Sequence, residues 1–255
     1  MIRHYMLRTF DHAGYYETRS LLALLALAIA LYFWTKRRDT RYLVMFVSGV
    51  LFQAFLEWYL QYFGARGAGY GFSVFRAQMS GIPGNLFQGL AEGGIFALMA
   101  FWFVDLHTQN PRERNSLRGY LAVCGLIIVL AMVVGILSAG QPITSPRPMA
   151  SASGLTRIAV TGGASLLLCA FRKNGLRYLG LFYVGLLIYT LITFEPLHVL
   201  GARYIGVRGP TGAFEASPLS GQLLWMLYSH TVEVAFGKIH YFAVPFALFG
   251  MTGQD

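Results

Sequence analysis

Charged residues are scarce in this 255-residue chain. They make up 12% of it, about half of the quarter typical of soluble domains. Apolar residues make up 56%, and the mean hydropathy is +0.53. This composition excludes a soluble globular enzyme, a disordered chain and a nucleic-acid-binding domain. The two cysteines, Cys124 and Cys169, stand in separate apolar runs, so there is no disulfide framework and no C-x-x-C motif.

Long apolar runs dominate the chain instead. A run near 20 residues is long enough to cross a bilayer as a helix. Residues 1–19 mix arginines with aromatic residues, as in a segment that lies in the membrane interface. We therefore predict an all-α, polytopic integral membrane protein with an interfacial segment at 1–19, one transmembrane domain at 20–250 and a short tail at 251–255. About seven helices are expected, at 20–35, 42–63, 86–106, 119–139, 155–171, 176–200 and 222–249.

The loops predict an orientation. Basic residues favour the cytoplasmic side of a membrane, and the formal net charge of +9 is expected from such loops facing anionic lipid. The loops after the first, third and fifth runs hold ten Lys and Arg residues. The other loops hold six, and residues 1–19 add three more. We predict that the N-terminus lies outside and the C-terminus in the cytoplasm, with the longer outer loops on the working face. The arginines of these outer loops, including Arg147 and Arg203, are expected to face solvent or lipid, or else to hold a substrate phosphate.

Four acidic residues stand inside the apolar runs. A charged side chain in the hydrocarbon costs at least ~2.5–3.5 kcal/mol, so such residues face the bundle interior and are functional by default. Counted from the helix ends, three of them share one depth in the outer half of the bundle, whereas Glu233 and His230 lie deeper. The candidate catalytic residues are Glu57, Glu92, Glu195 and Glu233.

Polar side chains repeat beside these acids at helical spacing. Gln53, Glu57 and Gln61 share one helix face, and Gly89 and Gly93 form a G-x-x-x-G pair around Glu92. Such stripes face a neighbouring helix, and small residues allow close approach. The expected pocket is lined by Gln53, Trp58, Gln61, Gln88, Tyr228 and Ser229.

One hypothesis is a metal site. Di-iron bundles take single glutamates from two helices and an E-x-x-H motif from each of two others. Glu195 and His198 form one E-x-x-H, whereas His230 and Glu233 occur in the reversed order, and Pro196 interrupts the first motif. This hypothesis predicts iron or zinc and a metal-dependent oxidoreductase acting on a lipid, isoprenoid or sterol-like substrate. Its ligands are Glu57, Glu92, Glu195, His198, His230 and Glu233.

A second hypothesis needs no metal. Carboxyl groups held in a dry pocket can act as acid and base on an alkene or epoxide, and nearby aromatic rings can stabilise a developing cation. In its size, its seven spans and the sequence Leu56-Glu57-Trp58, the chain resembles the small integral-membrane terpene cyclases. This resemblance implies a membrane-embedded isomerase or cyclase.

Two further hypotheses remain. Intramembrane Glu and His residues also relay protons in coupled carriers, although no internal repeat of the kind common in such folds is visible. Haem ligation would require His198 and His230 as a pair, and the depths counted from the helix ends separate them. In every case the expected partner is a membrane lipid or a lipophilic small molecule rather than nucleic acid.

Overall fold

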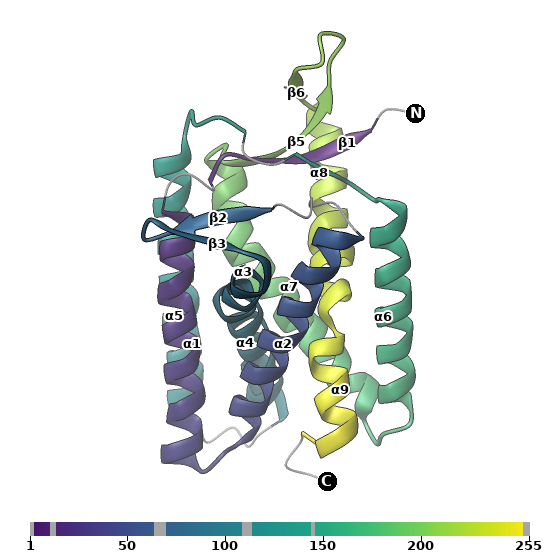
Figure 1. Ribbon diagram of the computed structural model, residues 1–255. Coiled ribbons are helices and arrows are strands. Elements are labelled where there is room, and N and C mark those ends of the chain that lie inside the picture. The colour runs from purple at the N-terminus through teal and green to yellow at the C-terminus, as the bar shows by residue number, and fades with distance from the viewer. Residues whose placement is uncertain (1–2, 11–13, 64–69, 109–113, 144–145, 252–255) are drawn as a thin grey trace.

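Seven long helical spans stand side by side in the computed structural model (Figure 1). The structure describes residues 3–10, 14–63, 70–108, 114–143 and 146–251, without the side chains of residues 114 and 115. All seven predicted spans are confirmed in number and order, so the chain is a multi-pass membrane protein. The spans are α1 (Tyr15–Arg37), α2 (Arg41–Tyr62), Gly81–Thr108, α5 (Arg114–Ser138), α6 (Ala152–Ala170), α7 (Gly175–Val199) and Leu219–Phe249.

The third span is the centre of the bundle. It consists of α3 (Gly81–Gln88), the π-helix η2 (Gly89–Gly94) and α4 (Ile95–Thr108), and it packs against α1, α2 and α7. A Cβ atom added at Gly93 would collide with the backbone oxygen of Gly49 on α2. The predicted G-x-x-x-G pair therefore permits close contact between these spans.

The seventh span is not a continuous α-helix. It runs through α8 (Leu219–Tyr228), the π-helix η3 (Ser229–Ala235), the 3-10 turn η4 (Phe236–Lys238) and α9 (His240–Phe249). The regular α-helix changes at Ser229, before the Gly237 and Pro245 positions of the same span. By contrast, α7 continues past Pro196 as far as Val199. π-Helical segments are rare and are often found at functional sites.

A small antiparallel sheet covers one end of the bundle (Figure 1). Residues 4–8 form a strand, so part of the predicted interfacial segment instead pairs with a distant loop, with Tyr5 opposite Gly206. Strand order is β4-β1-β5-β6, and a separate hairpin consists of β2 and β3. The strands are β1 (His4–Arg8), β2 (Gly71–Val74), β3 (Ala77–Ser80), β4 (Arg147–Pro148), β5 (Arg203–Arg208) and β6 (Phe214–Ala216).

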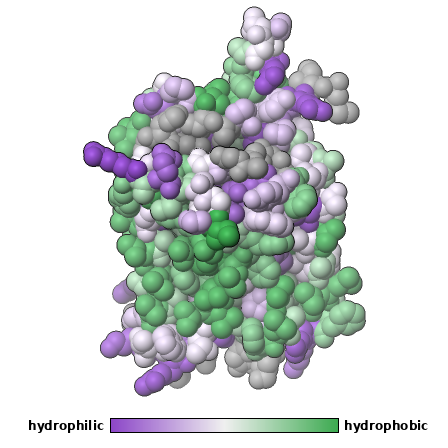
Figure 2. Space-filling view, viewed as in Figure 1, coloured by the Kyte–Doolittle hydropathy of each residue, from purple (hydrophilic) through white to green (hydrophobic). Residues whose placement is uncertain are grey.

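The surface agrees with a membrane location. Exposed Leu, Val and Phe side chains are spread along the helices, and the visible face carries a hydrophobic band with hydrophilic side chains towards both ends (Figure 2). Below the sheet, by contrast, the bundle interior contains several charged groups. Their arrangement defines the candidate site.

Candidate functional site

A polar cavity lies between the four-stranded sheet and the helical bundle. Its volume is about 140 Å³, roughly ten times the ~10–15 Å³ that holds one water molecule. Among the described residues, five cationic and three acidic side chains line it. These residues are Arg8, Arg147, Arg157, Arg203 and Lys238, with Glu57, Glu92 and Glu233.

Three of the four predicted catalytic acids therefore meet in one cavity. Glu57 comes from α2, Glu92 from η2 and Glu233 from η3. Glu195 does not line this cavity. Because two of the three acids lie on π-helical segments, a regular helical repeat does not describe where their side chains point.

A chain of hydrogen bonds holds Glu57. Gln53 Nε2 donates to Glu57 Oε1 at 2.9 Å, and the Tyr241 hydroxyl donates to Gln53 Oε1 at 2.7 Å. Glu57 is 1% exposed. Buried polar groups that are connected in this way keep a defined orientation, so the Glu57 carboxylate is fixed in the cavity wall.

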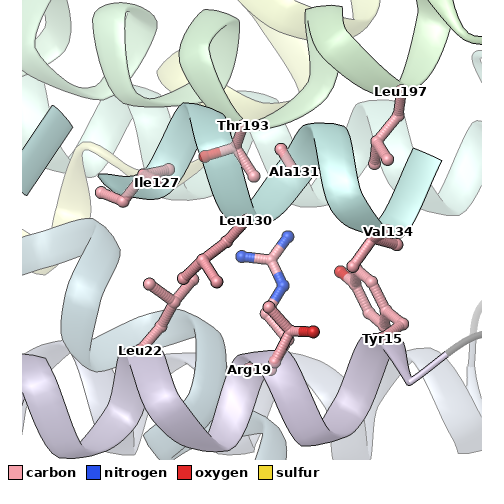
Figure 3. Close-up of a pocket in the computed structure, with 10 residues that line it drawn as sticks. Tyr15, Arg19, Leu22, Ile127, Leu130, Ala131, Val134, Thr193 and Leu197 are labelled. Atoms are coloured by element: carbon pink, nitrogen blue, oxygen red, sulfur yellow. The ribbon is translucent and has the colours of Figure 1, made fainter. Parts of the chain in front are cut away.

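Tyr15, the first residue of α1, contacts the second acid, Glu92. Its hydroxyl donates to Glu92 Oε1 at 2.9 Å, and the Arg19 guanidinium lies 4.8 Å from the centre of its ring. Figure 3 shows Arg19 rising from α1 towards Thr193 of α7, in a second cavity of about 20 Å³. Arg19 is thus a buried support behind Tyr15, outside the larger cavity.

Arg147 pairs with the third acid. Its guanidinium lies 2.8 Å from Glu233 Oε2, and the two side chains are 33% and 10% exposed. Arg157 of α6 donates to the backbone oxygen of Gly237 at 3.3 Å. Arg147 was expected to face solvent or lipid, or to hold a phosphate, whereas no such expectation was made for Arg157. Both arginines lie in the wall of the cavity.

Arg203 is almost fully buried, with 4% of its surface exposed. It donates to the sulfur of Met6 at 3.1 Å and to the Ser229 hydroxyl at 3.4 Å, and it lies 4.0 Å from the centre of the Phe194 ring. None of these partners carries a negative charge. Burial first, and then the charges of Arg147 and Arg8, lower the pKa of Arg203 to about 9.

Lys238 is the fifth cation and is 6% exposed. Its ammonium lies 3.7 Å from the centre of the Phe96 ring. Lys238 lines the same cavity as Glu57 and Glu92. A primary amine and two carboxylates can therefore exchange protons with a guest in that cavity.

The proposed metal ligands do not assemble as predicted. Glu195 Oε1 lies 3.1 Å from His230 Nδ1, and the His198 and His230 rings are 5.6 Å apart between centroids. Within the described ranges, no three His, Cys, Asp or Glu side chains are grouped so that they could hold a metal ion. The donor set required for a di-iron centre is therefore split between two places.

The depth estimate for His230 was wrong. Counting from the helix end placed it well below Glu195, yet the two side chains are in contact. The reason is that α8 reaches up to the sheet and packs against β5 (Figure 1). The depth of His230 below the membrane surface, when counted from the start of this helix, is therefore overestimated.

The predicted pocket residues are placed differently from one another. Gln53 lines the cavity, Gln61 bonds to Asn85 at 2.7 Å, and Ser229 contacts Arg203. Trp58, Gln88 and Tyr228 are not among the described residues that line the cavity. Trp58 is 40% exposed, Gln88 is buried in α3, and the Tyr228 ring contacts the Trp225 ring edge-on.

The cations and Tyr15 were not among the predicted site residues. A local signal existed only for Lys238, a basic residue inside an apolar run. Arg8, Arg147 and Arg203 lie outside the predicted spans and Arg157 lies near the start of one, and basic residues are common at such places in any membrane protein. Their convergence depends on the sheet, which brings β1, β4 and β5 over the helices.

The side wall between α2 and α6 is apolar. Leu56 and Leu60 of α2 and Gly154 and Ile158 of α6 line the cavity there. Both helices pack against the last span rather than extensively against each other. A hydrocarbon chain would find compatible surface along this wall.

The comparisons with known proteins add no relative to this description. Neither a protein-family model, nor a curated protein, nor a solved structure matches the chain.

Proposed function

We propose that the chain is an integral membrane enzyme that moves protons on a lipophilic substrate inside the cavity beneath the sheet. The observation that carries this proposal is the meeting of Glu57, Glu92 and Glu233, from three different spans, in one enclosed space. Buried carboxylates cost free energy in a membrane, and a bundle that needed them only for packing would not place them around a cavity.

The contacts suggest a role for each group. Glu57 and Glu92 accept hydrogen bonds from neutral donors, Gln53 and Tyr15, and are placed to accept a proton. Lys238 lines the same cavity as both and is placed to return one. Glu233 is engaged by Arg147 and positions that arginine. Removing a proton from one carbon of the substrate and adding one to another gives a double-bond isomerisation or a cyclisation, without a metal or an oxidant.

A revised count of charges supports the orientation. The positive-inside rule concerns basic residues in loops, and Arg8, Arg19, Arg147, Arg157 and Arg203 line cavities of the protein. Without them the described residues at the sheet end retain Arg3, Arg76 and Arg208, whereas those at the other end include nine basic residues. We propose that the sheet end and the N-terminus lie outside and the C-terminus in the cytoplasm.

Solvent deuterium tests the enzyme proposal without knowledge of the substrate. Purified protein in a non-ionic detergent is incubated with a total lipid extract in D₂O buffer. Mass spectrometry then identifies lipids that gain deuterium bound to carbon. We expect one labelled lipid class, and a labelling rate at least ~100-fold lower for Glu57→Gln.

The control is Glu215→Gln, which changes an exposed glutamate on β6. It should label lipids at the wild-type rate. Equal rates for Glu57→Gln and the wild type would contradict the proposal. A proton-coupled carrier would give no labelled lipid, but pH-driven uptake of a lipophilic solute into liposomes that Glu57→Gln abolishes.

A further inference from the structure

Among the described residues that line the cavity, five side chains are cationic and three are acidic. Arg147 is paired with Glu233, whereas Arg203 contacts only neutral groups among the partners described above. A buried charge without a counter-charge is costly, so an anion bound in the cavity would be stabilised.

The arginines are gathered at the sheet side of the cavity. Arg8 lies on β1, Arg147 on β4 and Arg203 on β5, which are adjacent strands. Arg8 is paired in register with Arg203, and Arg147 with Met6, two residues before Arg8, so the three arginines occupy neighbouring positions on adjacent strands. Arginine is over-represented where proteins bind phosphate or carboxylate groups, so this cluster suits an anion.

We propose that this arginine cluster, Arg8, Arg147 and Arg203 with Arg157 of α6, binds a phosphate group that belongs to the lipophilic substrate. The inference rests on the proposed function, because it names the class of lipid on which the acids act. The substrate is then a long-chain phosphate or diphosphate ester whose headgroup lies under the sheet.

Phosphate fits the cluster better than a carboxylate does. A planar guanidinium binds two oxygens of one phosphate at once, and a phosphate monoester offers three oxygens and up to two negative charges. Several arginines on neighbouring strands can therefore share one phosphate, which has more oxygens and more negative charge than a carboxylate.

The cavity also offers a place for the hydrocarbon part of the proposed substrate. The apolar wall formed by Leu56, Leu60 and Ile158 continues from the charged part of the cavity along α2 and α6. A chain lying there would have its first carbons near Glu57, which faces the same cavity. The headgroup site thus positions the reactive part of the substrate against the acids.

The test uses dodecyl phosphate as the probe. Its binding to the purified full-length protein in a non-ionic detergent is measured at equilibrium and by the shift in the thermal unfolding midpoint. Dodecanol and inorganic phosphate are measured in parallel. We expect dodecyl phosphate to bind at least ~10-fold more tightly than either, and Arg203→Gln and Arg157→Gln each to weaken it at least ~10-fold.

Arg208→Gln is the matched control. It removes an exposed arginine from the same strand as Arg203 and should leave the affinity unchanged. Two separate positions are tested so that a folding defect in one variant does not decide the result. Equal affinities for dodecyl phosphate and dodecanol, or wild-type binding by both cavity variants, overturn the proposal. Equal binding of inorganic phosphate and dodecyl phosphate overturns the lipid as the source of the phosphate.

The two proposals fail separately. Glu57→Gln should still bind dodecyl phosphate, because Glu57 is outside the arginine cluster. If Glu57-dependent deuterium labelling occurs in a neutral lipid and dodecyl phosphate does not bind, only the phosphate site is wrong. If dodecyl phosphate binds as expected but no lipid is labelled, the catalytic proposal is wrong and the phosphate site remains.

Discussion

Arg147 and Glu233 form an ion pair of 2.8 Å between residues that are 86 positions apart. Arg147 belongs to a two-residue strand at the edge of the sheet, and Glu233 to a π-helical segment inside the bundle. The pair therefore connects the sheet directly to the wall of the cavity. Because both partners are largely shielded from solvent, either one left alone is a poorly compensated charge.

This pair should contribute to stability more than a surface ion pair does. We expect Arg147→Gln and Glu233→Gln each to lower the free energy of unfolding, by about 1–3 kcal/mol, since Arg147 keeps some exposure. The double variant should lose less unfolding free energy than the two single variants lose together. The difference, the coupling energy, should be about 1 kcal/mol or more. Reversible denaturation in mixed micelles measures this cycle, and additive effects would show that the pair has no coupling.

Tyr15→Phe should separate catalysis from folding. The substitution keeps the ring above Arg19 but removes the hydroxyl that donates to Glu92. We expect a loss of about 1 kcal/mol in stability and a fall of about tenfold in deuterium labelling, because Glu92 loses its orientation. Tyr62→Phe, at a tyrosine that is 59% exposed, is the control. Wild-type labelling by Tyr15→Phe would show that this hydrogen bond to Glu92 has no part in the reaction.

Gly93 should tolerate no side chain. A Cβ atom there meets the Gly49 backbone oxygen and the Gln53 Cβ, whereas a Cβ atom at Gly163 of α6 meets no atom within 4 Å. Gly93→Ala should therefore lower the free energy of unfolding by about 1–3 kcal/mol through overpacking. Gly163→Ala should raise it by about 0.5–1 kcal/mol, because alanine favours the helix. Thermal unfolding in detergent compares the two, and equal effects would contradict the close contact of α2 with η2.

Replacing Arg203 should stabilise the protein in the absence of a ligand. Burial and the charges of Arg147 and Arg8 lower its pKa to about 9, so the folded state disfavours the charged form relative to the unfolded chain. The resulting destabilisation is fully present below about pH 9 and is relieved only as the pH rises above that value. We expect Arg203→Met to raise the free energy of unfolding at pH 7 by about 1–4 kcal/mol.

Arg203→Met should also lose dodecyl phosphate binding. A residue that binds the ligand at a cost in stability is expected to show both effects. Arg208→Met should change neither quantity. A clear loss of stability in Arg203→Met would show that the guanidinium is a structural support rather than a binding group.

The orientation can be tested by cysteine labelling. Cys124 and Cys169 are buried, at 8% and 0% exposure, so the background reaction with a membrane-impermeant maleimide should be low. Ala213→Cys lies in the exposed loop between β5 and β6, and Lys173→Cys in the exposed loop between α6 and α7. In intact cells Ala213→Cys should react and Lys173→Cys should not. The opposite pattern would reverse the proposed topology.

The sequence alone was sufficient for the architecture and for most of the acids. Hydrophobicity and run length are local properties, so seven spans could be counted before any contact was known. An ionisable residue in an apolar run is directed inwards by its solvation cost, and Glu57, Glu92 and Glu233 do line the interior cavity. The packing of Gly93 on α2 also followed from a local pattern.

Only the tertiary structure decided which charged groups meet. Glu195 pairs with His230 because α8 extends to the level of the sheet, and the two π-helical segments change the direction of side chains that a regular repeat would predict. Arg203 and Arg147 enter the cavity because β1, from one end of the chain, pairs with both β4 and β5. Strand pairing across some 200 residues depends on long-range contacts, which leave no periodic trace in the sequence of either partner.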